Sequence, residues 1–191
     1  MKKYFLLIVL SIVSLSLFSQ KMDEGLRISF GLPFANYGKF DHNYNNTNET
    51  NYPSFLIQVD KPWRDGFRLG AYAGFAGQKH EFRFNDFSEV KHSYYRLGGV
   101  LSYDLSDLLD AINISPERGV KLYASLKTGF SLEHIKAGEA VANINNKENN
   151  LLFDLGILIG GRYNISQNID IFSELGWGNA GFVTIGLSFD M

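Results

Sequence analysis

The residues that could do chemistry are mostly charged, and they recur at alternate positions in segments that are otherwise typical of β-strands. Side chains alternate between the two faces of a strand, so residues in one phase share a face. Buried charges need partners, and a balanced set therefore predicts a salt-bridged interior, with a proton or ion path as the alternative. The set of six cations and six acids is Arg27, Asp60, Arg68, Arg96, Asp104, Lys121, Lys127, Glu133, Asp154, Arg162, Asp170 and Glu174.

Metal binding and catalysis have weaker signals. Four histidines fall in or beside segments expected to be loops: His42, His80, His92 and His134. Loop imidazoles could bind a metal ion, but solvated side chains are the interpretation we favour. The chain has no cysteine, which excludes thiol nucleophiles and thiolate metal sites. We therefore assign no metal and no cofactor.

A hydrolase would need a serine, a histidine and a carboxylate that converge. The one local set is Glu89, His92 and Ser93. Strand phase turns His92 inward and Ser93 outward, so the two side chains would not meet. We expect no catalytic residues and no enzyme activity, and a lipid-modifying enzyme is the least favoured of the alternatives.

The first residues are typical of an export signal. Lys2 and Lys3 precede an uncharged, apolar stretch at residues 4–18. That stretch is shorter than the roughly 20 apolar residues of a membrane-spanning helix, and it fits a secretory signal peptide. Cleavage after Ser19 would leave residues 20–191 as one domain. A retained membrane anchor is the alternative.

Alternation of apolar and polar residues is the main structural signal. An even number of such runs puts both chain ends on one side of a membrane, and each crossing needs about 9–11 residues. The pattern predicts an all-β fold, an eight-stranded antiparallel up-and-down transmembrane β-barrel. The second run is the shortest of the eight, which cover residues 26–32, 55–60, 67–75, 95–105, 120–132, 151–163, 169–177 and 183–191.

The connections alternate in length, as in bacterial barrels. Short turns at residues 62–66 and 166–168 are expected inside, and long polar segments at residues 33–54, 78–92 and 133–150 are expected outside.

Two connections carry further signals. Residues 106–119 are long although they should lie inside, and the spacing of Leu108, Leu109 and Ile112 predicts a short helix there. Beyond Gln78 the apolar residues occupy the inward positions and the charged residues occupy the outward positions. This swap predicts that the hairpin projects above the membrane as paired strands.

Outward aromatic residues gather in two bands, near the two ends of the strands. Rings of amphipathic aromatics are expected at both membrane interfaces, whereas ordinary β-propensity is the alternative explanation. The inner band is Trp63, Phe67, Tyr103, Tyr163 and Phe189, and the outer band is Phe34, Phe55, Phe75, Tyr95, Phe130, Phe153 and Trp177.

The apolar start, the eight alternating runs and the closing segment at residues 184–189 resemble the outer-membrane β-barrel domain family, the OmpA/OmpX-like eight-stranded barrels. The resemblance covers roughly residues 20–191 and rests on pattern. It implies export through the periplasm to the outer membrane of a Gram-negative bacterium, contact with outer-membrane lipid and lipopolysaccharide, and insertion by the barrel assembly machinery. Such barrels usually end in an aromatic residue, whereas here Met191 follows Phe189 by two positions.

The expected function follows from the filled interior of so small a barrel. We expect a monomeric, non-enzymatic protein with a structural or adhesive role through extracellular loops, of which the asparagine-rich residues 36–52 are one. A narrow porin-like channel for small solutes or ions is the alternative. The formal net charge of −2 does not favour nucleic acid as a partner. A soluble lipocalin-like carrier conflicts with the inward charges and the outward Leu, Phe and Trp residues.

Overall fold

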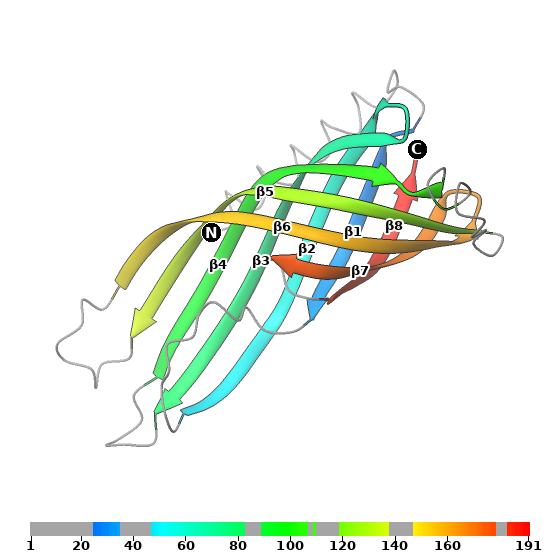
Figure 1. Cartoon of the computed structure of the whole chain (residues 1–191). Helices are drawn as coiled ribbons and strands as arrows, with labels where there is room; N and C mark the ends of the chain where they lie inside the picture. The colour runs from blue at the N-terminus through cyan, green and yellow to red at the C-terminus, as the bar shows by residue number, and fades with distance from the viewer. Residues whose placement is uncertain are drawn as a thin grey trace, which may run out of the picture.

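The computed structural model describes residues 25–34, 47–82, 89–106, 109, 119–137, 147–178 and 183–191. These residues form a closed antiparallel barrel in which every strand pairs with its neighbours in sequence and β8 pairs with β1 (Figure 1). The predicted eight-stranded up-and-down barrel is confirmed. The predicted signal peptide at residues 1–19 lies outside the described residues. The strands are β1 (Arg27–Phe34), β2 (Thr47–Arg64), β3 (Phe67–Phe82), β4 (Glu89–Asp104), β5 (Val120–Ala137), β6 (Lys147–Ser166), β7 (Ile169–Gly178) and β8 (Val183–Asp190).

The two ends of the barrel differ. One end, here called the turn end, carries the two-residue turns at residues 65–66 and 167–168 and the last residue of the chain. Backbone hydrogen bonds tie it together: Gly25 N donates to Met191 O, and Asp190 N donates to Asn168 O, both at 3.0 Å. In the first turn Gly66 has a φ of 71°, a left-handed conformation that glycine adopts without strain.

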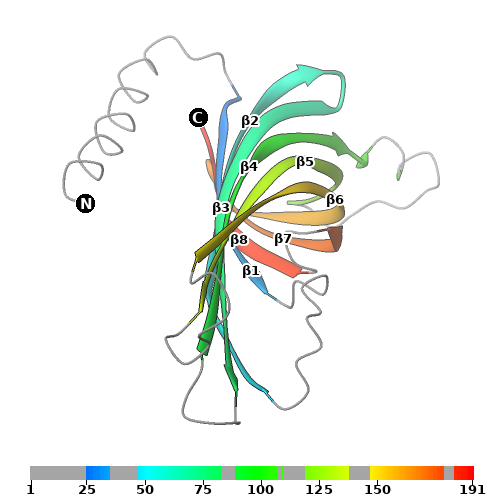
Figure 2. The same cartoon turned by 90° about the vertical axis from the view of Figure 1, so that its left-hand side faces the viewer.

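The opposite end, here called the wall end, is uneven. Strands β2 to β6 reach past the ends of β1, β7 and β8 (Figures 1 and 2). The β3–β4 pairing continues from Gln78 opposite His92 to Glu81 opposite Glu89. The predicted paired extension of this hairpin is therefore confirmed, and β5 and β6 extend beside it.

The length predicted for β2 is wrong. This strand has 18 residues, whereas β1 and β8 have 8 each. Its first half is rich in Asn, Thr and Pro, which have low or mixed strand propensity, but it pairs with β3 from Thr47 opposite Phe82 to Tyr52 opposite Gly77. Residues 62–64 also belong to β2, so the predicted turn is shorter than expected. Cross-strand pairing overrides local propensity at both places.

Large aromatic rings fill the lumen at positions where the neighbouring, paired strand carries glycine. A Cβ atom on Gly160 would lie 2.3 Å from Cζ of Tyr123, and one on Gly186 would lie 2.6 Å from Cε1 of Phe172. Both rings are buried. Inward glycines thus make room for bulky interior side chains at these positions.

The connection between β4 and β5 is described only at its edges. Ser106 and Leu109 are helical, and Leu109 N donates to Leu105 O at 3.0 Å. Leu108 and Ile112, which completed the predicted helix, lie outside the described residues. Among the residues that the structure describes, no helix combines the length and apolar character needed to cross a membrane.

Candidate functional site

The interior of the barrel is the candidate site, because it gathers charged side chains from all parts of the chain. Arg68 and Asp104 are partly exposed, and Lys121 is exposed at the mouth of the turn end rather than paired in the interior. The other nine predicted charges are buried: Arg27, Asp60, Arg96, Lys127, Glu133, Asp154, Arg162, Asp170 and Glu174.

The middle of the lumen holds an ion pair with almost no access to solvent. Lys127 Nζ lies 2.7 Å from Glu174 Oε2, and the two side chains are 3% and 1% exposed. Tyr123 OH donates to the other carboxylate oxygen of Glu174 at 3.1 Å. The three residues come from β5 and β7, so the pair reaches across the lumen past β6. Removal of one charge would leave the other buried and unpaired, which is costly.

A second group lies on β3, β4 and β6. Tyr72 OH donates to Asp154 Oδ2 at 3.1 Å, and both side chains are buried. Arg96 is also buried and lies within electrostatic reach of the Tyr72 hydroxyl. The Tyr72 hydroxyl thus has an acid, Asp154, as its hydrogen-bond partner and a cation, Arg96, near it.

Glu133 is the centre of a third group, toward the wall end. Its Oε1 atom contacts His92 Nδ1 at 2.9 Å and accepts a hydrogen bond from Tyr94 OH at 2.8 Å. Its Oε2 atom accepts from Asn150 Nδ2 at 3.2 Å. The ring of His80 lies perpendicular to that of His92, with centroids 5.6 Å apart.

The placement predicted for two of the histidines is therefore wrong. His80 and His92 are buried on strands β3 and β4 rather than solvated in a loop. The physical reason is that the alternation of β3 and β4 continues without a break beyond Gln78, so His80 and His92 stay on the inward face, as strand phase predicted for His92. His134 lies on β5 and contacts Asn149 Oδ1 at 2.7 Å, and His42 lies outside the described residues. No group of three or more potential metal ligands occurs within the described ranges.

The turn end holds a fourth group, rich in arginine. Arg27 binds both carboxylate oxygens of Asp190, at 2.6 and 3.0 Å. Arg68 binds Asp60, which also accepts from Gln58 Nε2 at 2.9 Å.

The remaining charges of this group have neutral partners. Arg162 Nη1 donates to Ser188 Oγ at 3.1 Å, and its guanidinium lies 4.6 Å from the centroid of the Tyr123 ring. Asp104 accepts hydrogen bonds from Ser106. Asp170 accepts from Asn164 at 2.9 Å.

The charge network predicted from the sequence left out the neutral partners and one acid. Alternation does place Asp190, Tyr72, Tyr94, Tyr123 and Gln58 on the inward face. Their pairing needs the register between strands, because Arg27 and Asp190 are 163 residues apart along the chain.

The outer face of the wall end carries a chain of exposed ion pairs. Lys79 lies 2.8 Å from Glu81 and 2.7 Å from Glu89, which in turn lies 2.8 Å from Lys91. Hydrogen bonds from Lys79 and Lys91 lower the pKa of Glu89 to about 2. The hydrogen bonds that Lys79 donates to Glu81 and Glu89 raise the pKa of Lys79. This surface is thus charged where the strands below it are apolar.

The predicted aromatic bands point outward from the barrel. Trp63, Tyr163, Phe34, Phe55, Tyr95, Phe130, Phe153 and Trp177 are exposed, and Phe67, Tyr103, Phe75 and Phe189 are partly exposed. Neighbouring rings are in contact: the centroids of Phe55 and Phe75 are 5.7 Å apart, those of Phe75 and Tyr95 5.3 Å, and those of Phe67 and Tyr103 4.6 Å.

The fold and the inside-out distribution of charge define the class: a closed, eight-stranded antiparallel barrel with charged side chains inside and apolar side chains outside. No family model and no curated protein matches the chain. Among solved structures, Neisserial surface protein A (NspA) is similar with 13% identity and a TM-score of 0.44, over 87% of this chain and 96% of that one. Ail, the attachment invasion locus protein of Yersinia pestis, solved with the heparin analogue sucrose octasulfate, has 13% identity and a TM-score of 0.40, over 87% and 95%. Likeness this distant does not extend to function.

Proposed function

We propose that this protein is a non-enzymatic outer-membrane barrel that acts at the cell surface through its wall end. The observation that carries the proposal is the reversal of ordinary globular polarity. Leu97, Ile157 and Ile159 are 69%, 58% and 62% exposed, whereas Glu174 is 1% exposed. Exposed apolar faces of this extent suit lipid, and a closed barrel satisfies the backbone polar groups that lipid cannot.

The direction of insertion follows from the two ends. Bacterial barrels have short periplasmic turns and longer extracellular connections. The turn end would therefore face the periplasm and the wall end would face outward. Cleavage of residues 1–19 and assembly of residues 20–191 as one domain belong to the same proposal, as do contact with lipopolysaccharide and insertion by the assembly machinery.

A side-chain-filled lumen supports a structural or adhesive role over a channel. The buried Lys127–Glu174 pair and the rings of Tyr72, Tyr123 and Phe172 occupy the interior. An eight-stranded barrel is just wide enough for such filling. A continuous water path would require these hydrogen-bonded groups to separate.

The wall end supports a surface role. Five strands carry it beyond β1, β7 and β8, and its outer face is charged at Lys79, Glu89 and Lys91. The paired strands of this end extend beyond the apolar part of the barrel, where a ligand on another surface could reach them.

Three measurements test the proposal. An epitope inserted between β5 and β6, at residues 138–146, should be accessible to antibody on intact cells, whereas the same epitope in the turn at residues 65–66 should require permeabilisation. Purified protein in planar bilayers should show little conductance. Steady ion-selective channels would contradict the structural or adhesive role and support the narrow channel instead. Recovery of the protein in the soluble periplasmic fraction would refute the membrane assignment.

A further inference from the structure

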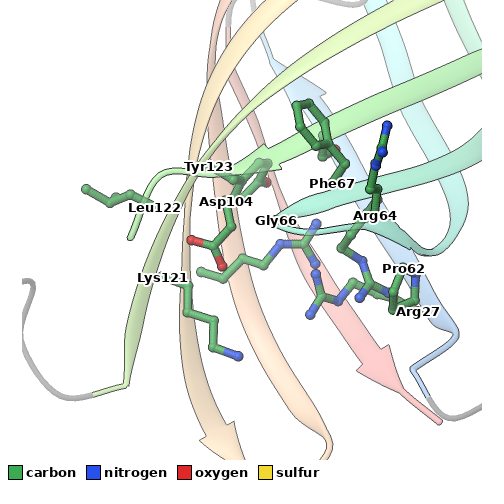
Figure 3. Close-up of a pocket in the computed structure, with 12 residues that line it drawn as sticks. Arg27, Pro62, Arg64, Gly66, Phe67, Asp104, Lys121, Leu122 and Tyr123 are labelled. Atoms are coloured by element: carbon green, nitrogen blue, oxygen red, sulfur yellow. The ribbon is translucent and has the colours of Figure 1, made fainter. Parts of the chain in front are cut away.

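The turn end contains a partly open cavity of about 230 Å³. In the view of Figure 3, Asp104 and Lys121 lie on one side of it, and Arg27 and Pro62 lie on the other. Asp104 is the acidic residue of its lining. The cationic residues of the lining come from five different strands and are Arg27, Arg64, Arg68, Lys121 and Arg162.

Carboxylates neutralise only part of this positive charge. Asp190 and Asp60 are bound to Arg27 and Arg68. Asp104 and Asp170 lie near the same mouth and are held by Ser106 and Asn164. Among the residues that the structure describes, two of the five lining cations thus have a carboxylate as ion-pair partner.

Three of the lining cations form no ion pair with a carboxylate among the described residues. Arg64 and Lys121 are exposed, and no hydrogen bond or ion pair engages them within the ranges described. Arg162 is buried, and its side chain bonds the hydroxyl of Ser188. The unpaired charge is thus concentrated on residues that line the cavity.

Arg162 is held in a geometry suited to recognition. Its guanidinium lies over the rings of Tyr123 and Phe172, at 4.6 and 5.6 Å, and one of its nitrogens bonds Ser188. The carboxylate of Asp190 lies within electrostatic reach of Arg27, Arg68 and Arg162 together. A guanidinium presents five donors in a planar fork, and a fork fixed by stacking is prepared for bidentate binding of an oxyanion.

We infer that this cavity binds a phosphate group, with Arg162 as the fork and Lys121 as the cation at the entrance. Since water occupies about 30 Å³ per molecule in the liquid, the cavity has room for a phosphate and part of an ester substituent. Phe67 and Leu122 also line it, so that substituent can be apolar. The phosphate can belong to a soluble molecule or to a phospholipid headgroup.

Calorimetric titration of the folded protein with inorganic phosphate, in uncharged maltoside micelles, tests the shared chemistry. Arg162→Lys keeps the charge but loses the fork, and should weaken binding about tenfold. Lys121→Gln should weaken it several-fold. Lys136→Gln is the matched control, because Lys136 is an exposed lysine on the same strand at the wall end, and it should bind as the parent does. Heat-modifiable migration on gels checks that each variant is folded.

Native mass spectrometry separates the two sources. Retention of phosphatidic acid by the parent and by Lys136→Gln, with loss in Lys121→Gln, would assign the site to a lipid headgroup; binding of inorganic phosphate without lipid retention would assign it to a soluble phosphate. The inference is overturned if neither probe binds the parent, or if Lys136→Gln weakens binding as much as Lys121→Gln does. The micelle titration does not require membrane insertion, so its failure leaves the proposed function untouched.

Discussion

Two ion-pair systems in this barrel use the same chemical groups in opposite surroundings. In the lumen, Lys127 and Glu174 are 3% and 1% exposed. On the outer face of the wall end, Lys79, Glu89 and Lys91 are 21%, 37% and 42% exposed. The distances are nearly equal, at 2.7 Å for Lys127–Glu174 and for Lys79–Glu89. Equal geometry does not mean equal energy, because water and salt screen the exposed pairs and not the buried one.

The largest effect should come from breaking the buried pair. Glu174→Ala removes the acid that accepts hydrogen bonds from Lys127 and Tyr123, and leaves an ammonium in the lumen without its partner. Loss of one member of a buried pair costs about 3–5 kcal/mol. The free energy of unfolding, measured by urea titration in lipid vesicles, should fall by this order.

A double variant sharpens that result. Lys127→Met together with Glu174→Ala removes both charges, so it should recover part of the lost stability, which a double-mutant cycle would measure. If Glu174→Ala leaves the free energy of unfolding unchanged and alters only ion selectivity, the interpretation that side chains fill the lumen is wrong.

The lipid face should respond to the reverse change, the introduction of a charge where apolar residues point outward. Leu126 is 40% exposed near the middle of β5. Leu126→Arg should lower the free energy of unfolding by roughly 2–4 kcal/mol, and the same change near a membrane interface by roughly 0–1 kcal/mol. Tyr163→Arg, near the turn end, is the matched control. A Leu126→Arg variant as stable as the parent in bilayers would contradict the inside-out assignment.

Packing in the lumen can be tested without any change of charge. A methyl group on Gly160 would meet the buried ring of Tyr123 at 2.3 Å, whereas one on the neighbouring Gly161 would have Leu122 Cδ2 as its nearest neighbour, at 3.4 Å. Gly160→Ala should cost about 1–3 kcal/mol, the usual range for overpacking, and Gly161→Ala should cost clearly less. Equal unfolding midpoints for the two variants would show that the lumen has room to spare.

The sequence was sufficient for the barrel because a closed sheet between lipid and a polar lumen imposes a strict period of two. That period placed Phe130 and Phe153 outward and Glu174 inward, and the structure agrees. The first half of β2 could not be predicted, since it is held by pairing with β3 rather than by propensity. Partners within the lumen were equally out of reach. The alternation of the strand gives the face on which Arg27 lies, but the partner of Arg27 follows only from the β1–β8 register, which places Asp190 opposite Arg27.

The smallest effect should come from the exposed chain of ion pairs, where pH rather than stability is the sensitive measurement. Hydrogen bonds from Lys79 and then Lys91 lower the pKa of Glu89 from 4.5 to about 2. The folded state therefore favours the ionised carboxylate, so any stabilisation is present above pH 4.5 and is lost as the pH falls toward 2. Titration of the Glu89 carboxyl by NMR should show this acid shift, and Lys79→Gln should move the pKa back toward its ordinary value. Added salt should do the same, because it screens exposed charges.

Glu89→Gln should leave the unfolding midpoint at neutral pH nearly unchanged. A loss as large as that of Glu174→Ala would show that burial does not separate the two systems.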